Sequence, residues 1–523
     1  MSSRPATPDD NPCHHVASAV IVVIGASGDL AKKKTFPALF GLFRNGLLPE
    51  RVRIIGYARS KLSQEDFRER ITSEKLKTAP QDQLQQFLSQ CEYISGQYDS
   101  QEDFKRLHSL IQDHERDLEK GLHGEVNRDH IRVFYMATPP SVFVPVARSI
   151  KSGAYDPDVK NRIVIEKPFG RDLASCRQFL SEFSSLFREE EIYRIDHYLG
   201  KEMVKNMPII RFANIFFEAV WNHEYIDNVQ ITFKEAFGTQ GRGGYFDEYG
   251  VIRDVMQNHM IQMLCVMAME KPASLHADDV RTAKADVLRH IPPIKIEDVI
   301  LGQYVGDTDG SEPGYTDDKT VPEGSITPTY ASLVLFINND RWRGVPIIMK
   351  AGKAMDEAKV EVRVQFKDVP EPHYQHISRN ELIARVGPTE AVYLKIMNKR
   401  PGLFSEPVIS ELDLSYRRRY SNAKIPEAYE ALLLEVLNGD QSHFLREDEL
   451  IAAWEIFTPL LHELERKHVQ PKPYAYGSRG PEGADDFLQK YGYKRRQQAY
   501  DWPDDLGRPV KEVAKEYAEK NKL

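Results

Sequence analysis

The sequence has little cysteine and no long apolar run. Its 523 residues include only four cysteines, Cys13, Cys91, Cys176 and Cys265, and no two of them form a Cys-x-x-Cys pair. A disulfide-framework protein is therefore excluded, and a zinc or redox site built on paired cysteines has no support. The longest apolar stretch, which begins at Ala19, is far shorter than the roughly 18 residues that a membrane-spanning helix needs.

Positive charge is not in excess either. The chain has 70 Lys and Arg against 78 Asp and Glu, a formal net charge of −8. This balance argues against a general nucleic-acid or anionic-membrane binder, although a local basic patch can still hold a phosphate. The polar N-terminus carries acidic residues and resembles neither a secretory signal nor an Arg-rich transit peptide. We therefore expect a soluble cytoplasmic protein.

The first 195 residues alternate between strand-like and helix-like segments. β-branched runs begin at Ser18 and cover 51–58, 131–140 and 162–170, with charged helical segments between them. Continuous apolar strands that alternate with helices are typical of a parallel, doubly wound sheet. The sequence thus predicts an α/β Rossmann-type dinucleotide-binding domain over 17–195.

The pattern changes after residue 195. A helix-like stretch covers 195–207, and several strands then follow without helices between them, the last two separated only by the turn 387–390. Short turns make neighbouring strands antiparallel. We expect a larger α+β domain with a large, mainly antiparallel sheet over 196–505. A disordered arm over 1–16 and a charged tail over 506–523 complete the predicted organisation.

A glycine-containing turn follows the first predicted strand and opens a helix. Gly25 permits a tight turn, and Gly28 lets a phosphate approach the backbone, where N–H groups and the helix end favour negative charge. The pattern is GxxGxxA rather than GxGxxG, so an ordinary strand-to-helix turn is the alternative. The predicted cofactor contacts in this segment are Gly25, Ala26, Ser27, Gly28, Asp29, Leu30, Ala31 and Lys32.

The end of the second predicted strand favours NADP over NAD. An NAD site places Asp or Glu there to bind the ribose 2′-hydroxyl, whereas this strand ends in Ala58-Arg59. Arg59 and Ser27 can instead hold a 2′-phosphate, because a guanidinium binds phosphate with two parallel hydrogen bonds. The alternative is that Arg59 is an ordinary solvated arginine.

These stretches and four others closely resemble the glucose-6-phosphate dehydrogenase family, its fungal members above all. The resemblance spans about 18–505 and implies the reaction β-D-glucose 6-phosphate + NADP⁺ → 6-phosphoglucono-δ-lactone + NADPH, the first step of the oxidative pentose phosphate pathway. It also implies a homodimer or homotetramer. The stretches that carry it are GASGDLAKKK (25–34), GYARS (56–60), EKPFGRDL (166–173), RIDHYLGKE (194–202), GRGGYFDEYGVIRDVMQNH (241–259) and YGSRGP (476–481).

Two of these motifs point to the substrate. On a helix, His197, Tyr198 and Lys201 would share a face and present donors to a phosphate dianion, whereas a solvated helix face is the alternative. The resemblance implies that the sugar 6-phosphate binds there. It also implies that Lys167 reaches the sugar and the nicotinamide, and that the peptide before Pro168 is cis.

Oxidation of a hemiacetal hydroxyl needs a base, and a histidine suits this role near neutral pH. The candidate is His259, which a carboxylate must orient. Two carboxylates are candidates. Asp254 is five residues away, a spacing that does not place it on the same α-helical face as His259, and Asp196 is distant in sequence. The resemblance implies that Asp196 orients His259, that Asp254 and Glu235 contact the sugar hydroxyls, and that Lys353 contacts the substrate phosphate.

The chain departs from the animal members of the family at two positions. Ala358 replaces a substrate-contacting arginine, and Gly387 replaces a glutamine, so both contacts are absent. Some members also bind a second, non-catalytic NADP, and the alternative here is a set of basic strands paired with carboxylates. The positions that match this second site are Lys350, which replaces an arginine, and Lys359, Arg363, Arg385, Tyr393, Lys395, Asp413, Arg419, Arg479 and Trp502.

Two other functions compete with the sugar-phosphate dehydrogenase. A related oxidoreductase could act on a non-phosphorylated sugar, but it would not need the cations near Lys201. A non-catalytic NADP sensor could retain the fold, but His259, Asp196 and Lys167 are all present.

Overall fold

The computed structural model describes residues 16–119, 129–307, 309–370, 373–374, 377–399, 402–403, 405, 407–420 and 425–494. The predicted tail over 506–523 and nearly all of the predicted arm over 1–16 lie outside these residues. The chain forms two compact units, and each is considered by itself. The first unit comprises Met1–Gly200, Ala273–Arg281 and Ile425–Ile451, and the second comprises Lys201–Pro272, Thr282–Lys424 and Ala452–Leu523.

The first unit is built on a seven-stranded sheet in the order β15-β6-β5-β4-β1-β2-β3. All neighbours are parallel except β15 and β6, which confirms the predicted doubly wound class. The strands of the central β-branched runs are almost completely buried, as expected for a sheet covered on both faces. Their bounds are β1 (Val16–Ile24), β2 (Arg51–Ala58), β3 (Cys91–Ser95), β4 (Asp129–Met136), β5 (Lys160–Ile165), β6 (Ile192–Ile195) and β15 (Phe444–Leu445).

The helices of the first unit pack on this sheet through apolar side chains. Phe40 of α1 packs edge-on against Phe87 of α4, with ring centroids 5.4 Å apart, and Leu432 and Val436 of α14 join the same core. The bounds are α1 (Phe36–Arg44), α2 (Gln64–Ile71), α3 (Glu74–Lys77), α4 (Gln81–Ser89), α5 (Gln101–Glu119), α6 (Phe143–Ser149), α7 (Leu173–Ser184) and α14 (Ala428–Asn438).

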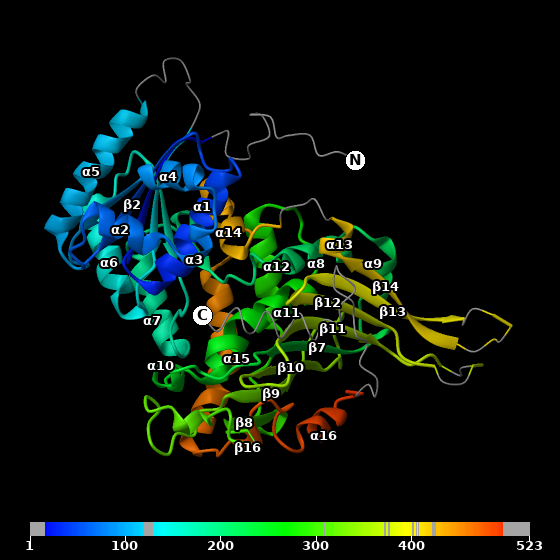
Figure 1. The fold of residues 1–523 in the computed structure, drawn as a ribbon. Coiled ribbons are helices and arrows are strands. Elements are labelled where there is room, and N and C mark those ends of the chain that lie inside the picture. Colours follow the sequence, from blue (N-terminus) through cyan, green and yellow to red (C-terminus); the bar gives the residue numbers. More distant parts are fainter. Residues whose placement is uncertain are drawn as a thin grey trace. The chain divides into compact units, whose positions relative to one another are not determined.

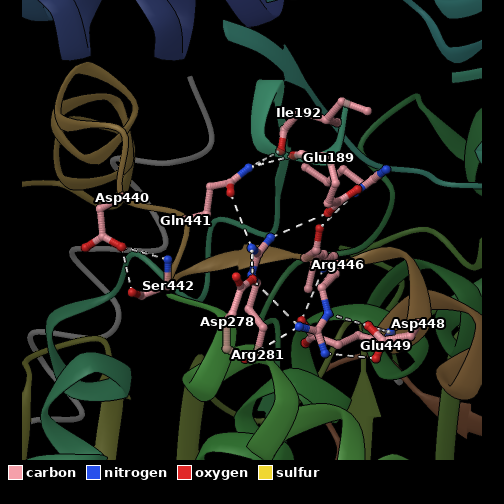
Figure 2. Close-up of polar contacts among 12 residues, drawn as sticks. Glu189, Ile192, Asp278, Arg281, Asp440, Gln441, Ser442, Arg446, Asp448 and Glu449 are labelled. Carbon is pink, nitrogen blue, oxygen red and sulfur yellow. Dashed lines mark hydrogen bonds and ion pairs between the residues drawn. The ribbon is translucent and has the colours of Figure 1, made fainter. Parts of the chain in front are cut away.

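A polar network attaches the two later segments of the chain to the first unit (Figure 2). The Gln441 side-chain amide donates to the carbonyl oxygens of Glu189 and Ile192, both at 2.9 Å. The buried Arg281 guanidinium donates to Asp278 at 2.7 Å and to the Gln441 side-chain oxygen at 3.3 Å. Because buried polar groups need partners, these bonds tie three distant segments together. The sequence predicts a single boundary between residues 195 and 196, whereas Ala273–Arg281 and Ile425–Ile451 also belong to the first unit.

The second unit is built on a nine-stranded sheet in the order β14-β13-β12-β11-β7-β10-β9-β8-β16 (Figure 1). Only the pairs β7–β10 and β8–β16 are parallel, which confirms the predicted mainly antiparallel sheet. The last two predicted strands, β12 and β13, pair as neighbours. The bounds are β7 (Ile226–Lys234), β8 (Val299–Val305), β9 (Tyr330–Leu335), β10 (Ile347–Gly352), β11 (Lys359–Phe366), β12 (Glu381–Gly387), β13 (Ala391–Lys399), β14 (Pro407–Ser415) and β16 (Lys472–Ala475).

The helices of the second unit include a π-helical segment, Ile252–Met260, that continues directly into α11. Within the described parts of the chain, no helix is both long and apolar enough to span a bilayer. The bounds are α8 (Glu202–Phe212), α9 (Ile215–Val220), α10 (Gly243–Asp247), α11 (Ile261–Ala268), α13 (Tyr416–Arg419) and α16 (Ala484–Gln489), while α12 (Ala277–Arg289) and α15 (Glu447–Arg466) contain residues of both units.

Candidate active site

The predicted cofactor turn lies at the end of β1. Gly25 has φ +90°, and a Cβ there would lie 2.5 Å from the carbonyl oxygen of Ala137, so both the backbone and the packing require glycine. The Gly25 N–H donates to the carbonyl oxygen of Tyr57 at 2.8 Å, which joins the turn to β2. The Gly28 N–H closes the turn on the Gly25 carbonyl oxygen at 2.9 Å. The helix then begins at Asp29, so its N-terminal end adjoins the turn.

The rim of this turn suits a phosphorylated ribose. The hydroxyls of Ser27 and Ser60 lie 3.1 Å apart, and the exposed Arg59 guanidinium carbon lies 5.1 Å from the ring centroid of Tyr98. No carboxylate among the described residues forms an ion pair with Arg59. Hydroxyls, a guanidinium and a helix N-terminus all favour a phosphate. These residues therefore fit a dinucleotide with a 2′-phosphate.

A second arginine lies at the same rim, although nothing in the sequence pattern points to it. The exposed Arg70 of α2 donates from Nε to the carbonyl oxygen of Ser27 at 2.6 Å. Arg70 lies eleven residues beyond Arg59, and no motif marks it. Only the position of α2 beside the turn could have identified it.

Lys167 follows a buried carboxyl group at the end of β5. The peptide between Lys167 and Pro168 is cis, as the resemblance implies. The Tyr135 hydroxyl donates to Glu166 at 2.5 Å, and the Tyr429 hydroxyl also hydrogen bonds to Glu166. Burial raises the pKa of Glu166 to about 7, although these hydroxyls and Lys167 oppose the rise. The sequence alone does not distinguish Glu166 from other glutamates, because only its burial makes it unusual.

Asp196, His197 and Tyr198 lie in a turn, and the predicted helix over 195–207 is wrong for its first part. The structure has β6 up to Ile195, a turn, and α8 only from Glu202. Asp196 accepts the Tyr198 N–H on its side chain at 2.9 Å and the Leu199 N–H on its carbonyl oxygen at 3.0 Å. An aspartate that binds the following backbone in this way favours a turn over a helix.

This turn determines the arrangement of the three residues that are predicted to bind the substrate phosphate. His197 and Tyr198 belong to the turn, and Lys201 stands immediately before α8, so the three do not share one helical face. The His197 ring instead lies parallel to the Tyr429 ring, with centroids 5.7 Å apart. The rings of His197 and Tyr198 are 4.8 Å apart.

The second unit gathers three of the predicted substrate residues. Lys353 Nζ lies 2.5 Å from a carboxylate oxygen of Glu235 and 5.1 Å from the ring centroid of Phe246. Burial lowers the pKa of Lys353, but the charges of Glu235 and Asp254 outweigh it, and the pKa lies above the usual value. Lys353 is thus a buried ammonium held in its charged form by two carboxylates.

His259, the predicted base, lies on the π-helical segment of the same unit. It is 3% exposed, and its ring lies nearly parallel to that of Phe233, with centroids 6.5 Å apart. The expectation that Asp254 and His259 lie on different faces of one helix assumed α-helical periodicity and is wrong here. A π-helix closes its turns between residues i and i+5, so a spacing of five returns to a similar face.

Most of the basic positions matched to a second NADP already have acidic partners. Arg363 pairs with Glu361 at 2.9 Å and with Glu381 at 2.8 Å. Further pairs are Lys359–Glu361 (3.4 Å), Lys359–Glu357 (3.7 Å), Lys395–Glu381 (3.8 Å), Lys350–Asp485 (3.9 Å) and Arg479–Asp485 (3.6 Å). The Arg385 guanidinium lies 5.9 Å from the Tyr393 ring centroid, Asp413 and Arg419 are exposed, and Trp502 lies outside the described residues.

Two family models cover nearly all of the chain. The model described as "Glucose-6-phosphate dehydrogenase, NAD binding domain" matches residues 22–206, and the one described as "Glucose-6-phosphate dehydrogenase, C-terminal domain" matches residues 208–502. The chain belongs to the glucose-6-phosphate dehydrogenase family.

Individual relatives of this family agree. The chain is 54% identical to a glucose-6-phosphate 1-dehydrogenase of Emericella nidulans, covering 92% of this chain and 94% of that protein. It is 52% identical to glucose-6-phosphate 1-dehydrogenase 5, cytoplasmic, of Arabidopsis thaliana, covering 92% and 93%. A solved glucose-6-phosphate dehydrogenase in complex with its substrate glucose-6-phosphate has a TM-score of 0.87 and 48% identity, covering 92% and 98%.

One of the two departures from the animal glucose-6-phosphate dehydrogenases leaves open space. A Cβ at Gly387 would meet no atom within 4 Å, so the missing side chain is not replaced by a neighbour. Ala358 is partly exposed just before β11. Neither position offers a polar side chain to a sugar.

Proposed function

We propose that this chain oxidises β-D-glucose 6-phosphate at its anomeric carbon to 6-phosphoglucono-δ-lactone, with NADP as the hydride acceptor. The observation that carries the proposal is the cluster of Lys353, Glu235 and Asp254 in the unit that also holds His259, in a chain of the glucose-6-phosphate dehydrogenase family. A buried cation between carboxylates suits a substrate that has both hydroxyls and a phosphate.

His259 is proposed as the general base. The reaction removes a proton from the anomeric hydroxyl, and an imidazole nitrogen accepts it. Asp196 is proposed to orient this imidazole, and Glu235 and Asp254 to accept hydrogen bonds from the sugar hydroxyls. An oriented base of this kind typically contributes about 10²–10⁴-fold to the rate.

The turn after β1 and its rim are proposed to bind NADP, which supplies the hydride-accepting nicotinamide when bound. Gly25 shapes the turn, and Arg59 and Ser27 are proposed to contact the 2′-phosphate. Lys167, at the end of a parallel strand, is proposed to contact the sugar, because ligands of such sheets bind beyond the carboxyl ends of the strands.

His197, Tyr198, Lys201 and Lys353 are proposed as the donors to the substrate phosphate. The turn at Asp196 explains how an imidazole and a phenol come together without a helix. Replacing Lys201 by alanine should weaken glucose 6-phosphate binding by about 1.5–3 kcal/mol, the value of a charge-assisted hydrogen bond. A substrate affinity that does not change would remove Lys201 from this set.

The experiment that tests the proposal follows absorbance at the NADPH band with three sugars: glucose 6-phosphate, glucose and galactose 6-phosphate. Each sugar is combined with NADP and with NAD. We expect efficient turnover only with glucose 6-phosphate and a preference for NADP. Equal activity on glucose would favour a non-phosphorylated sugar, and no activity on any sugar would favour a sensor that retains the fold.

We also propose a homodimeric or homotetrameric assembly and a cytoplasmic location. A second, non-catalytic NADP is a further hypothesis. The ion pairs of Arg363, Lys359 and Lys395 would have to be rearranged by a second dinucleotide, which counts against that site. Calorimetric titration measures the stoichiometry, and one NADP per subunit would remove it. Light scattering of the purified protein tests the assembly.

A further inference from the structure

We propose that Arg70 is a second cation for the 2′-phosphate of NADP and helps to set the preference for NADP over NAD. This proposal rests on the proposed function. It concerns the rim formed by Ser27, Arg59, Ser60 and Arg70, which joins the cofactor turn, the segment after β2 and helix α2.

Helix α2 is held beside the cofactor turn by its own packing. Phe67 lies against the backbone of Gly56, where a Cβ would lie 2.5 Å from the Phe67 ring and 3.0 Å from the Cβ of Ala26. The Phe67 ring also stacks on Tyr93 at 4.9 Å. Arg70 is three residues beyond Phe67, so this buried anchor fixes where the Arg70 side chain starts.

The start of the helix is fixed as well. Ser63 and Asp66 form a reciprocal capping box, in which the Ser63 hydroxyl accepts the Asp66 N–H at 3.1 Å. The Tyr93 hydroxyl donates to the carbonyl oxygen of Ser60 at 2.5 Å and thereby holds the segment between β2 and α2. The rim is therefore supported on both sides by hydrogen bonds.

The Arg70 side chain is oriented by its bond to Ser27. Its Nε donates to the Ser27 carbonyl oxygen at 2.6 Å, which leaves the two terminal nitrogens for another acceptor. The hydroxyl of the same serine lies 3.1 Å from that of Ser60. Two hydroxyls with a guanidinium from each of two segments form a donor set that suits a phosphate dianion.

The charge at this rim is not neutralised within the described part of the chain. Arg59 and Arg70 are both exposed, and neither forms an ion pair with a described carboxylate. The carboxylate of Asp66, four residues before Arg70, is engaged by the Ser63 hydroxyl at 2.8 Å. A phosphate monoester at this position would therefore meet two available cations rather than existing salt bridges.

The experiment is calorimetric titration of the full-length protein with adenosine 2′,5′-bisphosphate (2′,5′-ADP) and with 5′-AMP, which differ only in the 2′-phosphate and need no turnover. Arg70→Gln should weaken 2′,5′-ADP binding by about tenfold, the lower range for a charge-assisted contact, and leave 5′-AMP binding within about twofold. Arg70→Lys should fall between, because lysine keeps the charge but not the fork.

The matched control is Arg68→Gln. It removes the same charge from the same helix two residues earlier, about 200° around the axis, and should leave the ratio of the two affinities unchanged. If Arg70→Gln does not fold, Arg70→Lys and the salt dependence of the wild-type ratio provide the test.

Three results would overturn the proposal. An equal loss for both nucleotides in Arg70→Gln would mean that Arg70 only supports the turn through Ser27. An unchanged ratio in Arg70→Gln alongside a reduced ratio in Arg59→Gln would reject Arg70 and leave the cofactor assignment intact. A wild-type protein that binds both nucleotides equally would reject the NADP assignment itself.

Discussion

Each unit places a glutamate and a lysine together, but in opposite electrostatic settings. In the first unit Glu166 is buried between two tyrosine hydroxyls, and burial raises its pKa to about 7. In the second unit Lys353 is buried against Glu235, and the carboxylates keep its pKa above the usual value. Burial therefore favours the neutral form of the Glu166 carboxyl, while a direct ion pair keeps the Lys353 ammonium charged.

This difference separates two tasks. A permanently charged Lys353 suits binding of an anionic substrate at any physiological pH. A carboxyl group that titrates near neutrality makes the surroundings of Lys167 depend on pH, because the charge beside that lysine changes as Glu166 ionises. The surroundings of Glu166 in the first unit and of Lys353 in the second can be distinguished by substitutions that act on catalysis, on stability and on the pH dependence of stability.

The largest effect is expected at the proposed base of the second unit. His259→Asn removes the proton acceptor while keeping a polar side chain of similar shape, so turnover should fall by about 10²–10⁴-fold. The affinity for glucose 6-phosphate should change little, because the proposed phosphate donors are other residues. Steady-state rates at saturating substrates give the turnover, and calorimetric titration with glucose 6-phosphate gives the affinity. Turnover near the wild-type value would exclude His259 as the base.

Loss of the buried ammonium should be the next largest effect. Lys353→Met leaves Glu235 without the cation that lies 2.5 Å away, and breaking this part-buried pair should cost somewhat less than the about 3–5 kcal/mol typical of a fully buried pair. Thermal unfolding at neutral pH compares this variant with Lys353→Met combined with Glu235→Gln, which should recover part of the loss.

Lys167→Met is the matched variant in the first unit. Lys167 and Lys353 are both partly buried, but the neighbouring Glu166 is largely neutral below pH 7, so loss of Lys167 should lower the melting temperature less than loss of Lys353. Equal losses at the two lysines would mean that the ion pair with Glu235 does not stabilise the second unit.

The pH dependence of stability should report the raised pKa of Glu166. Its pKa in the folded chain is about 7, against about 4.5 for an exposed glutamate. Between these values the unfolded chain has lost the proton and the folded chain retains it, so this group destabilises the fold progressively as pH rises from about 4.5 to 7. Since one pKa unit is worth about 1.4 kcal/mol, the full effect is about 3 kcal/mol.

Glu166→Gln removes this titration. The melting temperature of the variant relative to the wild type should therefore rise as pH increases from 5 to 8. A constant difference between Glu166→Gln and the wild type across this range would contradict a raised pKa.

Much of the fold could be predicted from the sequence, because its information is local. The buried β-branched runs around β1 and β2 match their strands closely, and the hairpin of β12 and β13 follows from its short turn. The segment 195–207 was misread because a helical pattern of side chains does not reveal that Asp196 binds the next N–H groups itself.

The candidate site was less predictable, because its properties arise from packing between distant segments. The π-helical turns around His259 alter a spacing argument that assumed 3.6 residues per turn. Glu166 acquires its raised pKa only when packing of the fold buries it, and Arg70 reaches the cofactor turn only because α2 packs beside β2. None of these contacts leaves a signature in the local sequence.

The smallest effect is expected when one of the hydroxyls that hydrogen bond to Glu166 is removed. Tyr429→Phe keeps the ring that stacks on His197 but removes a hydrogen bond to Glu166. That bond favours the ionised carboxylate, so its loss should raise the pKa of Glu166 further. The stability cost should be about 1 kcal/mol and larger at pH 8 than at pH 5, because a bond to a charged acceptor is stronger. Tyr135→Phe should behave alike. Equal costs at both pH values would show that the two hydroxyls do not control this carboxyl group.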